Sequence, residues 1–253
     1  MNIRLDGRVA LITGATGGIG SAIATEFFRS GATVIINGRS QEKIDVFTNN
    51  LLSDANISDS NRVYGIALDL SEPNSEINII KHAIDKFHKI DILVNNAAIV
   101  DGKPISYSDE QFVKDVMLVN YQKPFLLTRN ALSYMRKAQY GRIINITSLA
   151  GQSGGKGLSN YAASKAAMHS FSQTIACEYG KYNITANSIA PGFVETKTLK
   201  KIPEEYKQNS KKLIPCHRFA TPSEVADLAT FLASERASYI NGQQIALNGG
   251  VYR

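Results

Sequence analysis

Short apolar runs rich in valine and isoleucine recur along the chain, and stretches with helical periodicity separate most of them. Strands that are buried on both faces read as continuous apolar runs, as these do. Their alternation with helices is typical of a parallel sheet covered on both sides. We therefore predict one α/β domain over residues 1–253, with a doubly wound parallel sheet of about seven strands. The expected strands are RVALIT, ATVIIN, RVYGIA, DILVN, RIINIT, ITANSIA and QQIAL.

The first predicted helix follows the first strand directly. Ile19, Ile23 and Phe27 keep the i, i+4, i+8 spacing of a stripe that faces the core. Gly31 follows as a stop signal.

Residues 192–218 interrupt the alternation, between the sixth predicted strand and a helix expected to begin near Pro222. The segment is long, polar and rich in lysine, which is typical of a lid or substrate loop. From Lys197 to Arg218 it contains seven basic residues and two acids. Such charge can attract an anionic substrate or an acidic protein, whereas most lysine runs are solvated helix faces. Both interpretations stay open.

Composition limits the other classes of function. Cys177 and Cys216 show no CxxC spacing and the four histidines show no paired-ligand spacing, so we predict neither disulfides nor a metal site. The early run VALI is too short for a secretory core, and we expect a cytoplasmic chain without a membrane span. The net charge of +6 raises nucleic acid as a partner, but no DNA- or RNA-binding motif is present, so we predict none.

A glycine-rich turn, TGATGGIG, lies between the first strand and the first helix and contains Gly14, Gly18 and Gly20. Glycines let the backbone approach a pyrophosphate closely, and a helix N-terminus offers N–H groups to its charge. The spacing is not GxGxxG, but a strand, a helix and a second strand follow in the expected order. The turn therefore predicts a dinucleotide site.

The residue after the second strand indicates which dinucleotide is bound. An acid about 20 residues beyond the turn binds the ribose 2′-hydroxyl of NAD in the general site. No acid occurs here between Glu26 and Glu42, and the strand ends in NGRS with Arg39. A guanidinium suits a 2′-phosphate, so NADP(H) is favoured over NAD(H). The alternative is a solvated arginine in a turn.

The stretch NYAASK, residues 160–165, places the phenol of Tyr161 four residues before the amine of Lys165. On a helix this spacing puts both side chains on one face. Their ordinary pKa values, about 10 and about 10.4, leave the phenol neutral and the amine charged near neutral pH. A lone YxxxK pair is most often only a helix surface, and it becomes significant when the chain also supplies a cofactor for it to act with.

Taken together, these motifs resemble the short-chain dehydrogenase/reductase superfamily from about Leu5 to Gly250. The shared motifs are TGxxxGxG at 13–20, Asp69 after the third strand, NNAA at 95–98, Asn120, Ser148, YxxxK at 161–165 and PG at 191–192. The resemblance implies a Rossmann-like fold and a catalytic set formed by Asn120, Ser148, Tyr161 and Lys165.

The resemblance also implies where NADP(H) binds. Asp69 is expected to contact adenine and Asn95 to steady the central sheet. The sequence departs from the family at Ala98, where glycine is usual, and at Gly17, where many NADPH-using relatives have a basic residue. The full set of expected cofactor-binding residues is Thr13, Gly14, Thr16, Gly18, Ile19, Gly20, Arg39, Ser40, Asp69, Leu70, Asn96, Ala97, Ala98, Tyr161, Lys165, Pro191, Gly192, Val194 and Thr196.

The implied chemistry is hydride exchange between nicotinamide and a carbonyl or alcohol carbon, which requires one proton at the oxygen. Tyr161 can supply it, and the ammonium of Lys165 with an oxidised nicotinamide should favour the phenolate and lower its pKa. Ser148 ends the strand RIINITS and can bind the substrate oxygen. The alternative is a serine bonded to its own backbone.

Asn120 precedes Pro124 by four residues in an apparently helical stretch. Proline has no N–H, so we expect a kink in which the Asn120 carbonyl lacks its usual helical hydrogen bond. In relatives this carbonyl holds a water that leads to the lysine. A kink that merely fits the packing is the alternative.

The function we predict is an NADPH-dependent carbonyl reductase, most like the 3-oxoacyl-[acyl-carrier-protein] reductases of fatty-acid synthesis, with an acyl carrier protein as a candidate partner. A reductase or dehydrogenase of a small ketone, sugar, polyol or steroid is the alternative. A nucleotide sensor without catalysis is less compatible with an intact Ser148, Tyr161 and Lys165. The resemblance also implies a homotetramer that pairs the helices containing Asn120 and Tyr161.

Overall fold

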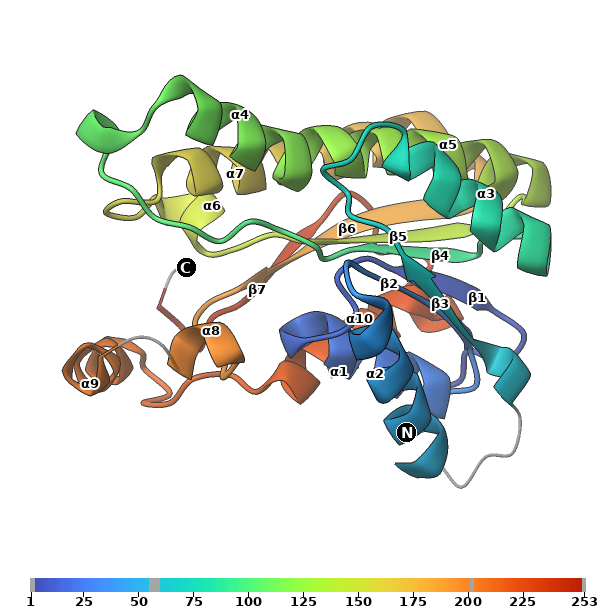
Figure 1. The fold of residues 1–253 in the computed structure, drawn as a ribbon, viewed down its shortest axis with the longest axis horizontal. Helices are drawn as coiled ribbons and strands as arrows, with labels where there is room; N and C mark the ends of the chain where they lie inside the picture. Colours follow the sequence, from blue (N-terminus) through green and yellow to red (C-terminus); the bar gives the residue numbers. More distant parts are fainter. Residues whose placement is uncertain (1–2, 55–59, 201–202, 252–253) are drawn as a thin grey trace.

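One parallel sheet organises the computed structural model, which describes residues 3–54, 60–200 and 203–251. Its strand order is β3-β2-β1-β4-β5-β6-β7, and every neighbouring pair is parallel (Figure 1). The seven-stranded doubly wound sheet predicted from the sequence is thus confirmed. The strands are β1 (Val9–Ile12), β2 (Thr33–Gly38), β3 (Val63–Ala67), β4 (Ile92–Asn95), β5 (Gly141–Ile146), β6 (Ile184–Pro191) and β7 (Gln244–Leu247).

Helices cover both faces of this sheet (Figure 1). One face is covered by α1 (Gly18–Arg29), α2 (Gln41–Asp54) and α10 (Pro222–Ala233). The other is covered by α3 (Ser75–Phe87), α4 (Glu110–Met117), α5 (Lys123–Ala138) and α7 (Ser159–Tyr179). Shorter helices are α6 (Ala150–Ser153), α8 (Lys197–Lys200) and α9 (Glu204–Leu213), and a π-helical turn, Leu118–Gln122, joins α4 to α5.

The strands read as continuous apolar runs because their side chains pack into two cores. Ala10 and Ile12 belong to the core under α1 and α10, whereas Val9 and Leu11 belong to the core under α3, α5 and α7. This alternation is the period of two that a strand imposes.

In α1, Ile23 and Phe27 are fully buried and Ile19 packs against them half-buried, as the predicted stripe requires. Gly31, two residues after the helix ends, adopts φ +100°, which favours glycine.

The segment 192–218 differs from the expected loop because it contains the helices α8 and α9. Leu199, Ile214 and Phe219 form a small apolar cluster with Phe193, which brings the start and the end of the segment together. The helical turns were hard to recognise because α9, EEYKQNSKKL, has too few apolar residues to show a stripe. The expected helix after this segment begins at Pro222. Lys201, which contributes to the predicted basic charge, lies outside the described residues.

The carboxyl ends of parallel strands meet at one edge of the sheet, and the sequence motifs follow them there. The glycine turn follows β1, Asn96 follows β4, Ser148 follows β5 and Gly192 follows β6. In Figure 1 this edge lies between α4 and α6 on one side and α8 and α9 on the other. Such an edge is where open α/β sheets bind their ligands.

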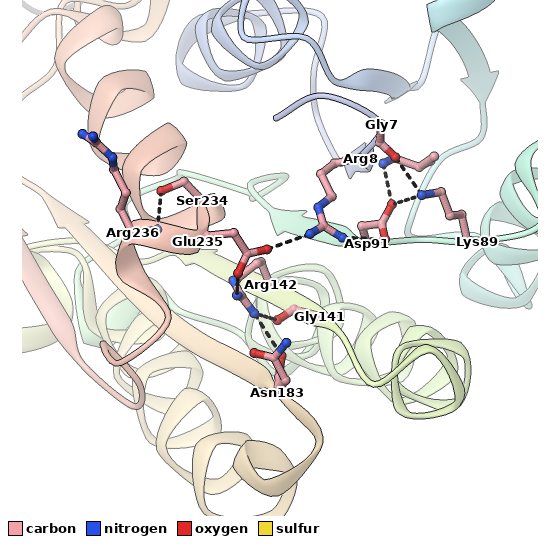
Figure 2. Close-up of polar contacts among 11 residues, drawn as sticks. Gly7, Arg8, Lys89, Asp91, Gly141, Arg142, Asn183, Ser234, Glu235 and Arg236 are labelled. Carbon is pink, nitrogen blue, oxygen red and sulfur yellow. Dashed lines mark hydrogen bonds and ion pairs between the residues drawn. The ribbon is translucent and has the colours of Figure 1, made fainter. Parts of the chain in front are cut away.

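At the opposite edge, a charged network ties together the amino ends of three strands (Figure 2). The guanidinium of Arg142, which is fully buried, lies 3.1 Å from Glu235, and Glu235 accepts a 2.7 Å hydrogen bond from Arg8. Arg8 also lies 3.7 Å from Asp91, which pairs with Lys89 at 2.9 Å. The network joins the start of β1, β4 and β5 to the segment after α10.

Candidate active site

The glycine turn is a tight cradle at the start of α1. Gly14 and Gly18 adopt φ +63° and φ +54°, which favour glycine. A Cβ at Gly14 would lie 3.0 Å from the Cα of Ala97, and a Cβ at Gly20 would collide with the Gly14 carbonyl oxygen. Ile19 lies in the first turn of α1 and is half-buried. The backbone is therefore close enough for a pyrophosphate to reach its N–H groups, which fits a dinucleotide.

Side chains from the neighbouring loop hold this cradle in place. The Thr13 hydroxyl accepts hydrogen bonds from the N–H groups of Asn96 at 3.0 Å and Ala97 at 3.1 Å. In return, Nδ2 of Asn96 donates to the carbonyls of Thr13 at 2.9 Å and Gly14 at 3.2 Å. Ala98 follows in the same loop, half-buried. The loops after β1 and β4 consequently form one unit.

Arg39 and Ser40 follow β2 at the edge of this cradle. The Arg39 side chain is exposed. It forms no hydrogen bond or ion pair with residues 3–54, 60–200 and 203–251. The Ser40 hydroxyl accepts a 3.3 Å hydrogen bond from the Lys43 N–H at the start of α2. Thr16 lies against β2, because a Cβ at Gly38 would be 2.9 Å from its Cγ2. A guanidinium and a helix N-terminus thus lie together where a ribose 2′-phosphate is expected.

Asp69 and Leu70 form the turn after β3. The Asp69 carboxylate accepts hydrogen bonds from the Ser71 N–H at 2.9 Å and the Ser71 hydroxyl at 2.8 Å, while Leu70 is buried. One carboxylate oxygen therefore shapes the turn. The other accepts no hydrogen bond from the described residues.

The residues after β6 close over the glycine turn. The Gly192 N–H donates a 2.9 Å hydrogen bond to Leu247, which keeps Pro191 and Gly192 beside β7. Val194 forms a parallel bridge with Ala220. The side chain of Thr196 lies against Gly18, where an added Cβ would be 3.3 Å from its Cγ2. The start of segment 192–218 is thus in contact with the cradle.

Tyr161 and Ser148 meet at the carboxyl end of β5. Burial raises the pKa of the Tyr161 phenol, and a hydrogen bond with Ser148 partly offsets this effect. The Ser148 hydroxyl also accepts a 3.1 Å hydrogen bond from the Ala150 N–H. The serine therefore bonds to the backbone of α6 and also faces the tyrosine, while its binding of a substrate oxygen stays a prediction.

Lys165 is buried on the same face of α7. Its Nζ donates a 2.8 Å hydrogen bond to the Ile146 carbonyl and lies 5.7 Å from the centre of the Tyr161 ring. Burial lowers the pKa of Lys165 to about 8. In the protein by itself, burial of the phenol outweighs every other effect and raises the pKa of Tyr161. The fall in this pKa with an oxidised nicotinamide bound stays a prediction.

Asn120 lies in the π-helical turn rather than at a simple kink. The Lys123 N–H donates to the carbonyl of Leu118, five residues earlier, which is the bond that defines a π turn. The Asn120 side chain accepts from the Ile99 N–H at 2.7 Å and donates to the Ile99 carbonyl at 3.0 Å. The proline at position 124 is thus accommodated by a wider turn, and the Asn120 amide fixes the loop after β4.

Sequence reasoning missed Ser164, which joins Asn120 to α7, the helix that contains Tyr161 and Lys165. Its hydroxyl accepts a 3.1 Å hydrogen bond from Nδ2 of Asn120 and donates one of 2.7 Å to the carbonyl of Tyr161. The available signal was its position, because a serine next to Lys165 on the buried side of a helix needs a polar partner.

A family model described as enoyl-(acyl carrier protein) reductase matches residues 14–252. The chain is 38% identical over 252 residues to the 3-oxoacyl-[acyl-carrier-protein] reductase FabG of Aquifex aeolicus, with all of both chains covered. The solved structure of a short-chain dehydrogenase/reductase, glucose/ribitol dehydrogenase, from Brucella melitensis has a TM-score of 0.91, 29% identity and full coverage of both chains. The chain belongs to the short-chain dehydrogenase/reductase family. It is an oxidoreductase of the class that acts on CH–OH and C=O groups.

The family includes relatives with other names. The chain is also 40% identical to nodulation protein G of a Rhizobium species over 248 residues, which cover 98% of each chain. Membership of the short-chain dehydrogenase/reductase family therefore establishes the enzyme class, and relatives with different names share that class.

Residues 3–54, 60–200 and 203–251 also bear on other kinds of site. No group of three or more histidine, cysteine, aspartate or glutamate side chains is arranged there to hold a metal ion. No helix within the same residues has both the length and the hydropathy of a membrane-spanning segment.

Proposed function

We propose that this protein is an NADPH-dependent reductase of 3-oxoacyl thioesters in which Tyr161 donates the proton. The observation that supports the substrate class most strongly is the 38% identity to a 3-oxoacyl-[acyl-carrier-protein] reductase over the full length of both chains. The meeting of Ser148, Tyr161 and Lys165 at the carboxyl end of β5 supports the chemistry.

The residues that would hold the cofactor line one continuous edge. The N–H groups of the glycine turn would bind the pyrophosphate, Asp69 and Leu70 would face the adenine, and Pro191 to Thr196 would close over the turn. The cradle fits such a group because side chains larger than glycine are excluded from it at Gly14 and Gly20. When bound, the reduced nicotinamide supplies the hydride.

The protein's own part of the reaction is the proton. A phenol whose pKa is raised by burial stays protonated at neutral pH, which is the state that a proton donor needs during reduction. The Ser148 hydroxyl, next to that phenol, would donate a hydrogen bond to the substrate oxygen as negative charge develops on it. The Lys165 ammonium would orient the ribose and stabilise the phenolate that remains after the transfer.

We also propose that NADP(H) is preferred because of Arg39. Its guanidinium is exposed beside the start of α2, and no acid occupies the position that would bind a ribose 2′-hydroxyl. A 2′-phosphate there would gain a charge-assisted hydrogen bond.

A second candidate is the oxidation or reduction of a small sugar or polyol. The likeness to a glucose/ribitol dehydrogenase structure, with a TM-score of 0.91, favours it.

An assay of dinucleotide oxidation separates these candidates. NADPH and NADH would each be tested with acetoacetyl thioesters of coenzyme A, with acetoacetyl carrier protein, with free ketones and with sugars. We expect kcat/KM to be highest for NADPH with a thioester. A preference for a sugar or for a free ketone would instead support the second candidate.

An acyl carrier protein is a candidate partner through the basic segment 192–218. Part of that charge is already paired, since Arg218 bonds to Glu224 at 2.6 and 2.9 Å and Lys207 bonds to Glu204 at 3.2 Å. Lys211 lies 5.1 Å from the centre of the Phe219 ring. The charge left for an acidic partner is therefore smaller than the sequence count suggested. If it recruits a carrier protein, kcat/KM for the carrier-bound substrate falls as salt is added, more steeply than for a neutral ketone.

We further propose a cytoplasmic homotetramer in which copies pair through α5 and α7. Tyr121, Phe125 and Phe171 form an aromatic cluster there, with the rings of Phe125 and Phe171 4.9 Å apart, and Phe125 is still 37% exposed. A second copy would bury this surface. Light scattering after size-exclusion chromatography should give four times the mass of the chain.

A further inference from the structure

A buried ion pair connects α3 to the start of α5. Nζ of Lys123 lies 2.5 Å from Oε2 of Glu76, and the two side chains are only 7% and 8% exposed. The same ammonium donates a 2.7 Å hydrogen bond to the backbone carbonyl of Glu72. Lys123 therefore contacts both a side chain of α3 and the backbone of the turn that precedes α3.

The Glu72 carbonyl belongs to the turn that would bind adenine. The Glu72 N–H donates a 3.1 Å hydrogen bond to the carbonyl of Asp69, and the Ser75 hydroxyl donates one of 2.9 Å to the carbonyl of Leu70. The turn from Asp69 to Ser75 is thus closed on itself, and Lys123 holds it from the side of the catalytic helices.

The other end of the connection reaches the catalytic residues. Lys123 immediately follows the π-helical turn, and its N–H closes that turn on Leu118. Asn120, in the same turn, donates to Ser164 at 3.1 Å, and Ser164 donates to the carbonyl of Tyr161 at 2.7 Å. A continuous series of contacts therefore runs from the turn after β3 to the backbone of Tyr161.

An ion pair is an uncommon choice for such a buried place. Removing two charges from water opposes their attraction, so that a well-packed apolar pair is often at least as stable. Burial opposes ionisation of Glu76, but the hydrogen bond from Lys123, a backbone hydrogen bond and the charges of Lys123 and Arg129 together lower its pKa below the ordinary value, so the carboxylate stays ionised. What an apolar side chain could not do at position 123 is bond to the Glu72 carbonyl.

We propose that Lys123 and Glu76 are positioning residues that couple occupancy of the turn Asp69–Ser75 to the arrangement of Asn120 and Tyr161. This inference rests on the proposed function in one respect, namely that this turn contacts the adenosine part of the dinucleotide. A bound adenosine group fixes the Glu72 carbonyl, which fixes the ammonium of Lys123 and with it the π-helical turn. Because such coupling is reciprocal, ligands on the Tyr161 side should also strengthen adenosine binding.

Hydrogen exchange of backbone amides can test the coupling without catalysis. The probes are adenosine 2′,5′-bisphosphate and adenosine 5′-monophosphate, which represent the adenosine halves of NADP and NAD. In the wild-type protein, at least one probe should slow exchange in residues 68–75 and should slow it about fivefold in residues 116–125. In Glu76→Leu/Lys123→Met, the slowing at 68–75 should remain and that at 116–125 should disappear.

The double variant is chosen because Lys123→Met alone would leave a buried carboxylate without its partner. A matched control is Glu110→Gln/Lys114→Gln, which removes an exposed pair 2.6 Å apart on α4 and should behave like the wild type. Equal slowing at 116–125 in the wild type and the double variant would overturn the coupling. The coupling would also be overturned if a probe slowed exchange at 68–75 but not at 116–125 in the wild-type protein. This second result can be obtained without any variant. If neither probe protects 68–75, the cofactor assignment itself fails, and the coupling fails with it.

Discussion

Nζ of Lys165 lies 5.7 Å from the centre of the Tyr161 ring, one helical turn away along α7. The same ammonium donates a 2.8 Å hydrogen bond to the carbonyl of Ile146, the last residue of β5. Ser148 follows two residues later. The lysine is therefore fixed to the strand that leads to the serine, and the tyrosine stands between the two on a rigid helix.

Replacing Tyr161 with phenylalanine should remove the proposed proton donor and little else. The ring is half-buried and phenylalanine fills the same space, so dinucleotide binding should stay near normal. Turnover should fall by about two to four orders of magnitude, the usual contribution of a general acid. Steady-state kinetics with the best carbonyl substrate would measure it.

Tyr239→Phe is a suitable control for this experiment, because that tyrosine is fully exposed and should not affect turnover. If Tyr161→Phe kept most of the wild-type rate, another acid would have to supply the proton.

The buried amine of Lys165 should make stability depend on pH in the alkaline range. Its pKa is about 8 in the folded protein against an ordinary value of 10.5, so between these values the unfolded chain binds more protons. The free energy of unfolding should then rise with pH across this window, by up to about 3 kcal/mol from this group. Below pH 8 the group is charged in both states and adds no slope.

Urea unfolding of the wild type and of Lys165→Met at pH 8 and 10 would isolate the effect, since other groups titrate in both proteins. The difference in unfolding free energy should shift in favour of the wild type as the pH rises. A constant difference would mean that the lysine is not held in an apolar environment.

The sequence predicted the sheet because buried parallel strands leave an unmistakable pattern, and it predicted the glycine turn because few residues tolerate that backbone. It did not predict that Arg142, inside the run RIINIT, is fully buried and paired with Glu235, 93 residues away. Nothing local in the chain distinguishes this arginine from a solvated one, since its partner is brought close only by the fold.

The polar contacts around the site were hidden for a similar reason. Position along a helix places Ser164 on the buried side, but its bonds to Asn120 and Tyr161 depend on how the π-helical turn meets α7. The proline at position 124 predicted an irregular turn. A kink and a π turn can each accommodate a residue that has no N–H, so the sequence does not distinguish them. The pKa of Tyr161 likewise depends on burial by the whole fold, which a motif does not describe.

Arg39→Ala should separate the two dinucleotides. If the guanidinium binds the 2′-phosphate, its loss should raise KM for NADPH about tenfold or more, as expected for a hydrogen bond between charged groups. KM for NADH, which has no such phosphate, should change little. Lys86→Ala, an exposed cation in the last turn of α3, serves as the control for net charge. Equal changes for both dinucleotides would remove Arg39 from the site.

The glycine turn offers a test with a control three residues away. A Cβ at Gly20 would collide with the carbonyl oxygen of Gly14 and with the side-chain amide of Asn96, which bonds to that carbonyl. Gly20→Ala should therefore open the turn, displace its N–H groups and weaken NADPH binding at least about tenfold, although alanine favours a helix more than glycine does.

Gly17→Ala should bind NADPH almost as the wild type does. A Cβ at Gly17 would meet nothing within 4 Å, and the residue has an extended backbone, φ −168°, that alanine can adopt. As Gly17 is the N-cap of α1, the substitution should reduce stability by less than about 1 kcal/mol. Fluorescence titration of both variants with NADPH would compare them directly. Because each substitution adds the same methyl group to the same turn, only the space around it differs. Equal affinity for the two variants would show that the close approach of Gly20 to Gly14 is not what shapes the dinucleotide site.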